Sequence, residues 1–370
     1  MIDVHEPTLK IPRLTDIQQL SIDSMRTFVQ QEVTPHAALL RFGPASREQL
    51  LEFTQVVAEF GLPGLAVPKA LGGSGMDWAT QARLFEELVK GSPELASVVL
   101  INMLAVELLL LRPDLCSRYL PDLLAGRSIA GLGMAIAPHS TGRPLHAQRS
   151  GEHILLDGKI DEVAGGLWAN LLISAVALDD QSSCFVLLDR RRDRYDTRAI
   201  RLDSNAARVQ FTATRVSSEF VLGDAGAQSL LSRRLLDVLK LYEGVARVAQ
   251  AQVMLDATLA AVPASATLEA PCVGAPLVTM HLAEMITQVE AARLMCHRGL
   301  LLAQEHQDCA AESSMALFFA QGAVDRIERH VDWINGTRSE RSPLLALQLG
   351  ALSCEESKVH AQSIVRHRIC

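Results

Sequence analysis

The side chains that offer chemistry in this chain are its cysteines and its carboxylates. Seven cysteines are scattered along the sequence, and no two have the C-x-x-C spacing of zinc sites or redox motifs. Their odd number also predicts no disulfide framework, and the sequence shows no metal site. The carboxylates remain as candidate catalytic groups. A single carboxylate can abstract a proton without help from a cofactor. Most acids are solvated, and the pair Glu355-Glu356 has that plain reading as charged residues on a last helix.

Composition narrows the class of protein. The 370 residues suffice for two or three packing units, and the hydrophobic and charged shares of 49% and 21% are ordinary for a folded chain. An aromatic share of only 4%, in a chain rich in Leu and Ala, favours helix over sheet. The net charge of −7 argues against a nucleic-acid partner. With no apolar run of bilayer length and no signal pattern at the N-terminus, we expect a soluble, cytoplasmic protein without a membrane partner.

Periodicity divides the chain into three blocks. Helical spacing covers 16–33, 46–60, 78–90 and 93–111, with Ser46 as an N-cap and Gly61 as a helix stop. Short apolar stretches then alternate with Gly and Asp from about residue 129 to 223, and Asp157-Gly158 is a tight-turn signal. Long helix-like segments follow at 228–259, 280–306, 311–334 and 344–365. Helices, then strands, then helices predict a mainly helical α+β protein with separate packing units.

Seven short motifs occur in an order that resembles the acyl-CoA dehydrogenase family. They are V-P-K-A-L-G-G-S-G-M-D at 67–77, F-E-E-L at 85–88, Y-L-P-D-L-L-A-G at 119–126, L-D-G-K at 156–159, R-V-S followed by V-L-G at 215–223, G-A-P-L at 274–277 and E-A-A-R-L at 290–294. The resemblance spans most of the chain. Their plain role is structural, as turn glycines, a helix entry and core positions, so they speak for the fold more than for the chemistry.

The resemblance implies an N-terminal helical domain (1–128), a middle β-barrel-like domain (129–224) and a C-terminal four-helix bundle (225–370). It also implies an oxidoreductase that desaturates an acyl thioester, carried by CoA or by an acyl-carrier protein. In the family a base removes the α-proton and FAD takes the β-hydride. Relatives are dimers and tetramers, so the resemblance implies a homodimer or a homotetramer.

Register with the family motifs predicts the cofactor contacts. The flavin-facing loop keeps only Pro138, with Ser140 and Thr141 as hydroxyl donors or as members of a simple turn. Ala164 falls in the segment that packs on the flavin, where Asp161-Glu162 replaces an aromatic wall; Trp168 either substitutes for that wall or packs in its own core. Diphosphate contacts fall on Gly336 and Arg338, whereas the segment 268–274 has no basic residue.

Register also predicts the catalytic base. In the commoner family layout the base lies near the C-terminus, and with a one-residue gap it falls on Glu355. In a second layout it lies on the first C-terminal helix, where counting back from Ala249-Gln250 gives Asp237, an acid that is otherwise an exposed helical residue.

Two alternatives to the flavin enzyme stay open, because several cofactor contacts differ from the family motif. One is a flavin-free subunit that pairs with an intact paralogue in a mixed oligomer. The other is a flavin-free lyase or dehydratase that reuses the acyl pocket, with His139 or Glu162 as further site residues.

Overall fold

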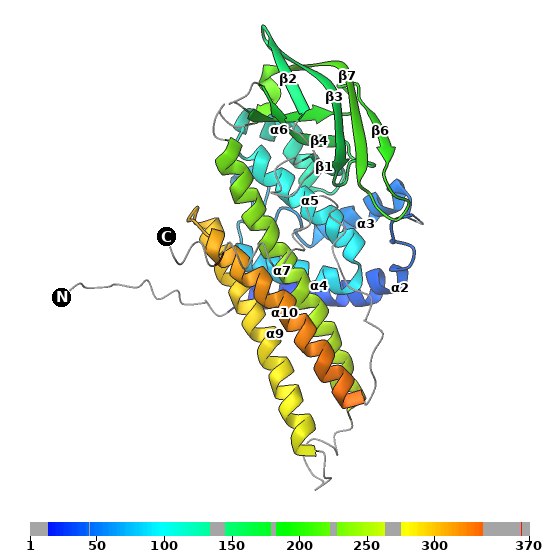
Figure 1. The fold of residues 1–370 in the computed structure, drawn as a ribbon, viewed down its shortest axis with the longest axis vertical. Helices are drawn as coiled ribbons and strands as arrows, with labels where there is room; N and C mark the ends of the chain where they lie inside the picture. Colours follow the sequence, from blue (N-terminus) through cyan, green and yellow to red (C-terminus); the bar gives the residue numbers. More distant parts are fainter. Residues whose placement is uncertain are drawn as a thin grey trace, which may run out of the picture.

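The computed structural model describes residues 14–43, 45–133, 145–178, 183–222, 228–262, 275–335 and 364. Figure 1 shows two helical parts and a sheet: short helices beside the middle of the molecule, a twisted sheet at one end, and long helices that run away from the sheet. No helix in these described ranges is long and apolar enough to cross a membrane.

The N-terminal helices begin at the residues that the sequence marks as caps. Ser46 accepts a hydrogen bond from the N–H of Gln49, and the Gln49 side chain answers it in a capping box, which confirms the predicted N-cap. The predicted helix 16–33 is a regular helix followed by one π-helical turn, Val29–Val33. The elements of this part are α1 (Asp16–Phe28), α2 (Thr34–His36), α3 (Arg47–Glu59), α4 (Trp78–Gly91), α5 (Pro93–Leu109) and α6 (Pro113–Leu124).

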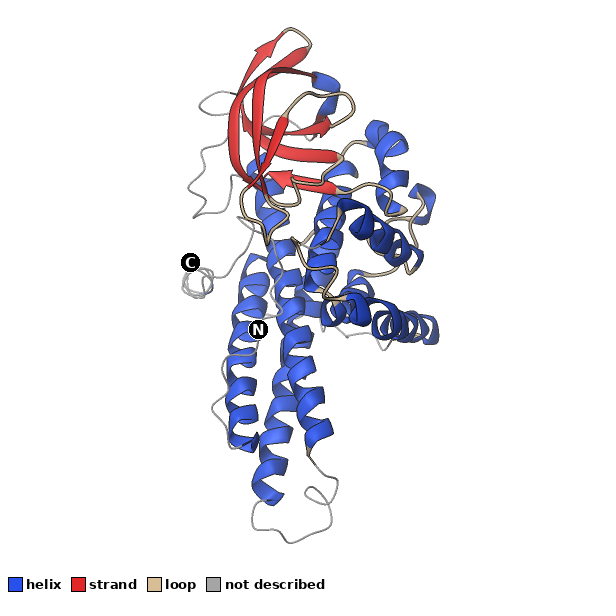
Figure 2. Cartoon of the chain, turned by 90° about the vertical axis from the view of Figure 1, so that its right-hand side faces the viewer, coloured by secondary structure: helices blue, strands red, loops and turns tan. Residues whose placement is uncertain are grey.

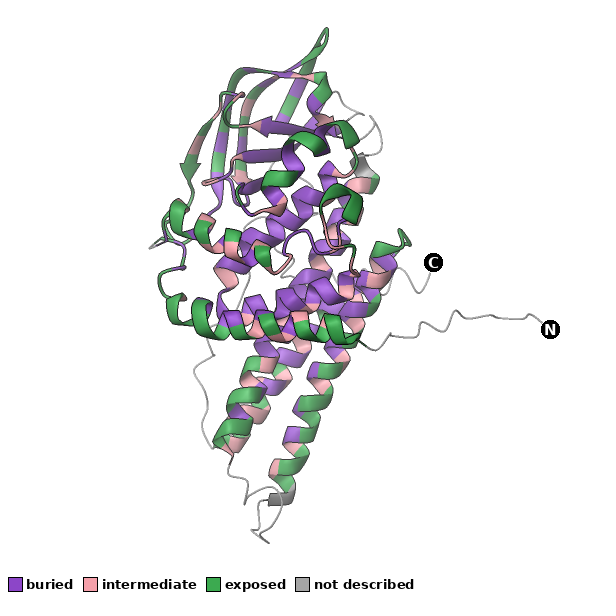
Figure 3. Ribbon diagram, turned by 180° about the vertical axis from the view of Figure 1, so that it is seen from behind, coloured by how far each residue is buried: buried purple, intermediate pink, exposed green. Residues whose placement is uncertain are grey.

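Helix α5 is the centre of the N-terminal part. It is apolar on all sides, and nearly all of its residues are buried. Figure 3 shows that buried residues fill the inside of the N-terminal part. Helix α6, which no periodicity predicted, follows it directly and carries Pro121 inside the helix.

The glycine-rich loop before α4 has a structural role. A Cβ atom on Gly73 would lie 2.2 Å from the carbonyl oxygen of Val67, so only glycine fits there. Asp77 then caps α4 by accepting a hydrogen bond from the Thr80 N–H at 2.6 Å. The motif therefore fixes where α4 begins and how its side chains are aimed.

The strands form one mixed sheet in the order β6-β7-β3-β2-β4-β5-β8, and β1 pairs with β4 beside β2. Figure 2 shows the sheet curling over the end of the helices. The strands are β1 (Ala130–Gly133), β2 (Leu145–Ser150), β3 (His153–Val163), β4 (Leu171–Ala177), β5 (Ser183–Asp189), β6 (Asp196–Ala199), β7 (Ala207–Ser217) and β8 (Val221–Leu222).

The tight turn predicted at Asp157-Gly158 is wrong. Strand β3 runs straight through both residues, and its pairing with β7 shifts register between Leu156 and Gly158. Gly158 has φ +120°, so the residue type that suggested a turn serves a β-bulge instead. The turn between β2 and β3 lies at Gly151.

Three long helices form the described C-terminal part: α7 (Gln228–Ala261), α9 (Ala275–Gln304) and α10 (Ala310–Asn335). The 34 residues of α7 span about 50 Å, from the sheet to the far end of the molecule. The predicted last helix, 344–365, lies outside the described residues except Ile364, which is helical.

Candidate functional site

Helix α4 joins the N-terminal part to the long helices. The Gln81 side chain donates a hydrogen bond to the hydroxyl of Tyr242 on α7 at 2.9 Å, and the Phe85 ring meets the Tyr242 ring edge-on. The N–H of Trp78 donates to the side-chain oxygen of Gln304 on α9 at 2.7 Å. The Gln81–Tyr242 hydrogen bond is buried and the Trp78–Gln304 hydrogen bond is partly buried, so directional contacts help to fix the relative position of the two helical parts.

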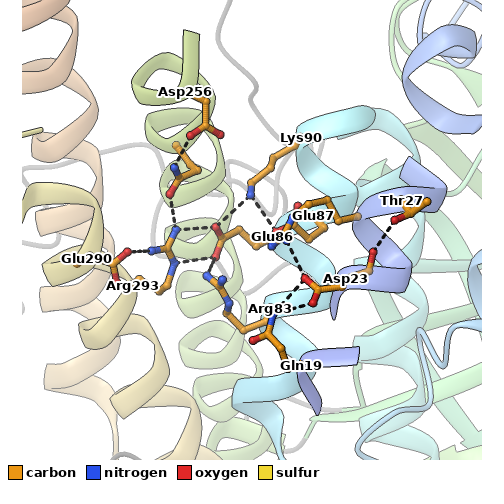
Figure 4. A network of polar contacts seen from close by, with 12 residues as sticks. Gln19, Asp23, Thr27, Arg83, Glu86, Glu87, Lys90, Asp256, Glu290 and Arg293 are labelled. Atoms are coloured by element: carbon orange, nitrogen blue, oxygen red, sulfur yellow. Dashed lines mark hydrogen bonds and ion pairs between the residues drawn. The ribbon is translucent and has the colours of Figure 1, made fainter. Parts of the chain in front are cut away.

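A buried ion pair lies at the centre of this junction (Figure 4). Arg293 on α9 donates from Nη2 to Glu86 Oε1 at 2.8 Å and from Nε to Glu86 Oε2 at 3.1 Å. Arg293 also donates to Gln252 on α7 at 2.8 Å. Glu86 and Arg293 belong to the F-E-E-L and E-A-A-R-L motifs, and the structure brings those two motifs together across 207 residues.

Further charges surround this pair. Arg83 lies 2.9 Å from Glu86, while the neighbouring acid Glu87 is bound by Arg26 and Lys90, each at 3.0 Å. Burial alone would raise the pKa of Glu86, but the hydrogen bonds and charge of Arg293, with the charges of Arg83 and Lys90, lower the pKa to about 2. Glu86 is therefore ionised at neutral pH and acts as a structural anchor, not as a base.

Glu107 is the acid whose surroundings fit proton transfer. It lies near the end of α5, partly buried, and among the described residues none donates a hydrogen bond to it. Burial raises the pKa of Glu107 to about 7, although the charge of Arg234 on α7 opposes the shift. A carboxyl group that is half protonated near neutral pH can both give and take a proton.

We expect Glu107→Gln to stabilise the protein at pH 8 by about 1–3 kcal/mol and to change little at pH 4. The folded pKa lies above the ordinary value of 4.5, so ionising Glu107 costs folding free energy as the pH rises from about 4.5 to about 7. The expected gain in stability is smaller than the full pKa shift of Glu107 would give, because the side chain is partly exposed and solvent screens its charge. Urea unfolding at both pH values measures it, with Glu52→Gln, an exposed acid on α3, as the control. Equal stability of the parent and Glu107→Gln at pH 8 would contradict the raised pKa of Glu107.

Asp237 lies on α7, as the register predicts, but its carboxylate is bound. Its Oδ1 accepts hydrogen bonds from the Lys240 ammonium and from the Ser313 hydroxyl, both at 2.9 Å. Ser313 stands on α10, so the Asp237 carboxylate joins α7 to α10. The role of Asp237 as a base stays a prediction, and a proton taken up there would weaken two contacts.

Ala164 is the single predicted cofactor contact among the described residues. Its side chain is buried, its N–H donates to the carbonyl of Leu132 at 3.1 Å, and its carbonyl accepts from the Leu132 N–H at 2.8 Å. Both backbone groups are therefore used by the sheet, and the side chain is a methyl group. At this position the chain therefore offers a flavin only the apolar contact of a methyl group.

The other predicted site residues lie outside the described residues. They are Glu355 as the base, and Pro138, Ser140, Thr141, Gly336 and Arg338 as cofactor contacts. His139 lies there as well. Their roles stay predictions.

Near Ala164, the structure also places Trp168 and the acidic pair Asp161-Glu162, for which the sequence left alternative roles open. The ring of Trp168 packs against Phe42 of the N-terminal part, with 5.7 Å between the ring centroids. Asp161, next to Glu162, lies at the surface and pairs with Lys159 at 3.0 Å and Arg208 at 3.1 Å. The acidic pair is therefore partly neutralised by basic side chains of β3 and β7.

Two features of the junction escaped the sequence reading. Glu107 stands in a run of leucines, and a lone acid in an apolar helix is the signal that could have indicated a buried carboxyl. His297 lies one turn beyond Arg293 and is buried. Its burial, and to a lesser extent the charge of Arg83, lower the pKa of His297 to about 4. A neutral His297 therefore adds no further positive charge to the junction.

Comparison with known proteins agrees with this architecture. The model of the acyl-CoA dehydrogenase N-terminal domain matches residues 15–127, and that of the C-terminal domain matches residues 231–360. The mitochondrial short-chain specific acyl-CoA dehydrogenase of Rattus norvegicus is 22% identical over 357 residues, covering 87% of this chain and 81% of the relative.

Solved structures share the fold at low identity. Butyryl-CoA dehydrogenase from Megasphaera elsdenii has a TM-score of 0.82 at 18% identity, covering 98% of this chain and 100% of that one. The prolyl acyl carrier protein oxidase AnaB has a TM-score of 0.77 at 19% identity, covering 96% and 100%. Because family models match both of its helical parts, the chain belongs to the acyl-CoA dehydrogenase family.

Proposed function

We propose that this chain is an acyl-thioester oxidoreductase that removes the α-proton of its substrate and forms the α,β-unsaturated product. The observation that supports it most is the intact junction between the two helical parts, held by Glu86 and Arg293. In a family whose members act on acyl thioesters, as their names state, that junction keeps the helices that would surround the acyl group in one arrangement.

The proposed chemistry begins with a carboxylate that takes the α-proton, which is acidic because the thioester carbonyl stabilises the resulting enolate. Glu355 is the proposed base, Asp237 is the alternative, and Glu107 is a third acid with a suitable pKa. Desaturation also removes a hydride from the β-carbon, and FAD is the acceptor that family membership suggests.

The acyl carrier is either CoA or an acyl-carrier protein. The relatives include enzymes named for both carriers, and both present the same thioester to the base. Exposed apolar side chains on α9 and α10, such as Met280, Phe318 and Trp333, support a homodimer or a homotetramer. A cytoplasmic location remains part of the proposal.

A flavin-free role is the second candidate, and the environment of Ala164 favours it. The side chain of Ala164 is a buried methyl group, and both of its backbone groups are paired with Leu132, so it offers a flavin no polar contact. The chain would then act as a lyase or dehydratase on the acyl thioester, or as the partner of an intact paralogue.

Two measurements on one purified sample separate these candidates. A visible spectrum is taken before and after incubation with FAD and gel filtration, whose elution also gives the size of the oligomer. Deuterium uptake at the α-carbon of an acyl thioester in D₂O then reports proton abstraction without any need for a flavin.

We expect a yellow protein that is bleached by its acyl thioester and that also exchanges the α-hydrogen. A colourless protein that exchanges the α-hydrogen would contradict the oxidoreductase and favour the lyase or dehydratase. A colourless protein without exchange would contradict both enzymes and favour the partner subunit.

A further inference from the structure

A cluster of three side chains that can bind a metal ion lies between α9 and α10. His281 and Glu284 stand one helical turn apart on α9, and His330 faces them from α10. These residues are near the start of α9 and the end of α10, at the end of the long helices that is remote from the sheet (Figure 1). The cluster is therefore separate from the junction at Glu86 and Arg293.

The three side chains are already close together. The Nδ1 atoms of His281 and His330 are 2.7 Å apart, and Nε2 of His330 is 3.2 Å from Oε2 of Glu284. Each residue can present one ligand atom, and the three atoms lie within 4.8 Å of one another. Two imidazoles and a carboxylate within this distance can surround a single ion once the Glu284 carboxylate, which now contacts Nε2 of His330, rotates toward the Nδ1 atoms.

Neighbouring groups hold the two rings in place. The ring of Trp333 lies against His281, with 4.1 Å between the centroids, and the nearby Arg326 donates two hydrogen bonds to the side-chain oxygen of Gln288. Burial lowers the pKa of His330, and the charge of Glu284 opposes that change. An imidazole binds a metal ion through the lone pair of a ring nitrogen, and both rings present such a nitrogen within the cluster.

We propose that His281, Glu284 and His330 bind one divalent transition-metal ion, with zinc as the best match. Two histidines and one glutamate form a ligand set that zinc accepts, and water completes the tetrahedron. Zinc–nitrogen bonds of about 2.0–2.1 Å place two imidazole nitrogens roughly 3.3 Å apart. The present 2.7 Å separation needs to open by only a few tenths of an ångström.

The bound ion adds a link between two helices that already meet through packing and hydrogen bonds, such as those from Arg326 to Gln288. It links α9 and α10 near their ends, where each helix adjoins a segment outside the described residues. Because the site requires the folded helix pair, zinc binding stabilises the folded chain by mass action. The His281–His330 spacing of 49 residues explains why the sequence showed no metal site.

Zinc titration of the full chain tests the proposal. After removal of metal by a chelator, calorimetric titration with ZnCl₂ is expected to show one ion bound per chain. His330→Gln is expected to weaken binding at least tenfold, and Glu284→Gln to weaken it as well. Zinc is expected to raise the melting temperature of the parent chain but not that of His330→Gln. MgCl₂ is expected to do neither, because magnesium prefers oxygen ligands.

The control is His153→Gln, which removes an exposed histidine from β3 and is expected to bind zinc like the parent. Circular dichroism shows whether each variant is folded. Zinc binding that is as tight in His330→Gln and Glu284→Gln as in the parent would overturn the proposal, as would a parent chain that binds no zinc.

Discussion

Replacing Arg293 by methionine is expected to lower the free energy of unfolding by about 3–5 kcal/mol. The substitution keeps most of the apolar stem of the side chain but leaves the Glu86 carboxylate, which is 1% exposed, without its bidentate partner. Arg83 and Lys90 stay near Glu86, but losing the bidentate partner of a buried charge costs much more than losing an exposed ion pair. Chemical denaturation followed by circular dichroism measures the difference.

Arg298→Met is the matched control. Arg298 is an exposed arginine five residues further along α9, and its replacement is expected to change stability by at most about 0.5 kcal/mol. The double variant Glu86→Gln/Arg293→Met is expected to lose less stability than the sum of the two single variants. An Arg293→Met variant as stable as Arg298→Met would show that the junction does not depend on the pair.

The same pair predicts a response to acid. Glu86 has a lowered pKa in the folded chain, so its stabilising effect is complete above its ordinary value of 4.5 and disappears as the pH falls toward about 2. In Arg293→Met the burial of Glu86 is no longer opposed by that guanidinium, so the folded pKa of Glu86 rises and the variant loses less stability than the parent between pH 4.5 and pH 2.

Glu355→Gln is expected to lower the rate of α-hydrogen exchange in an acyl thioester by about 10²–10⁴-fold. Glutamine keeps the size of the side chain but cannot accept the proton. Deuterium incorporation in D₂O, followed by mass spectrometry, measures the rate directly and is independent of whether a flavin is present.

Neighbouring and competing acids serve as comparisons for this variant. Glu356→Gln, one residue further along, is expected to exchange at the parent rate, because only one acid of the pair is in register with the family base. A loss confined to Asp237→Asn would place the base on α7, and a loss confined to Glu107→Gln would place it on α5. Either result would contradict the assignment to Glu355.

Local signals predicted the helices well because they act within a few residues. Ser46 and Gln49 satisfy each other at the start of α3, so the cap is readable without any knowledge of the rest of the fold. The family motifs then predicted the order of helices, sheet and helices, which the structure and the family models confirm.

Weak local signals explain the elements that were missed. Strand β6 has four residues and β8 two, so neither is long enough for an alternating pattern to be distinct. Asp157-Gly158 was misread because a glycine with positive φ serves a hairpin turn and a β-bulge equally well. Only the pairing with β7 distinguishes the two.

Contacts between distant helices could not be predicted from one sequence. The acid Glu86 was visible in a helix motif and Arg293 in another, but nothing local indicates that these two residues meet. The raised pKa of Glu107 likewise depends on the burial that α7 and its neighbours provide. Sites assembled from separate helices are therefore the part of this protein that required a structure.

The Glu86–Arg293 pair also restricts which substitutions can accumulate at these two positions during evolution. A point mutation at either codon removes one partner of a buried bidentate ion pair, and selection for folded protein acts against that loss. Only a simultaneous exchange of both residues for apolar ones of similar volume keeps the junction filled. The two positions, which lie in different helical parts, are therefore expected to change together. A descendant protein that lacks the glutamate is expected to lack the arginine as well.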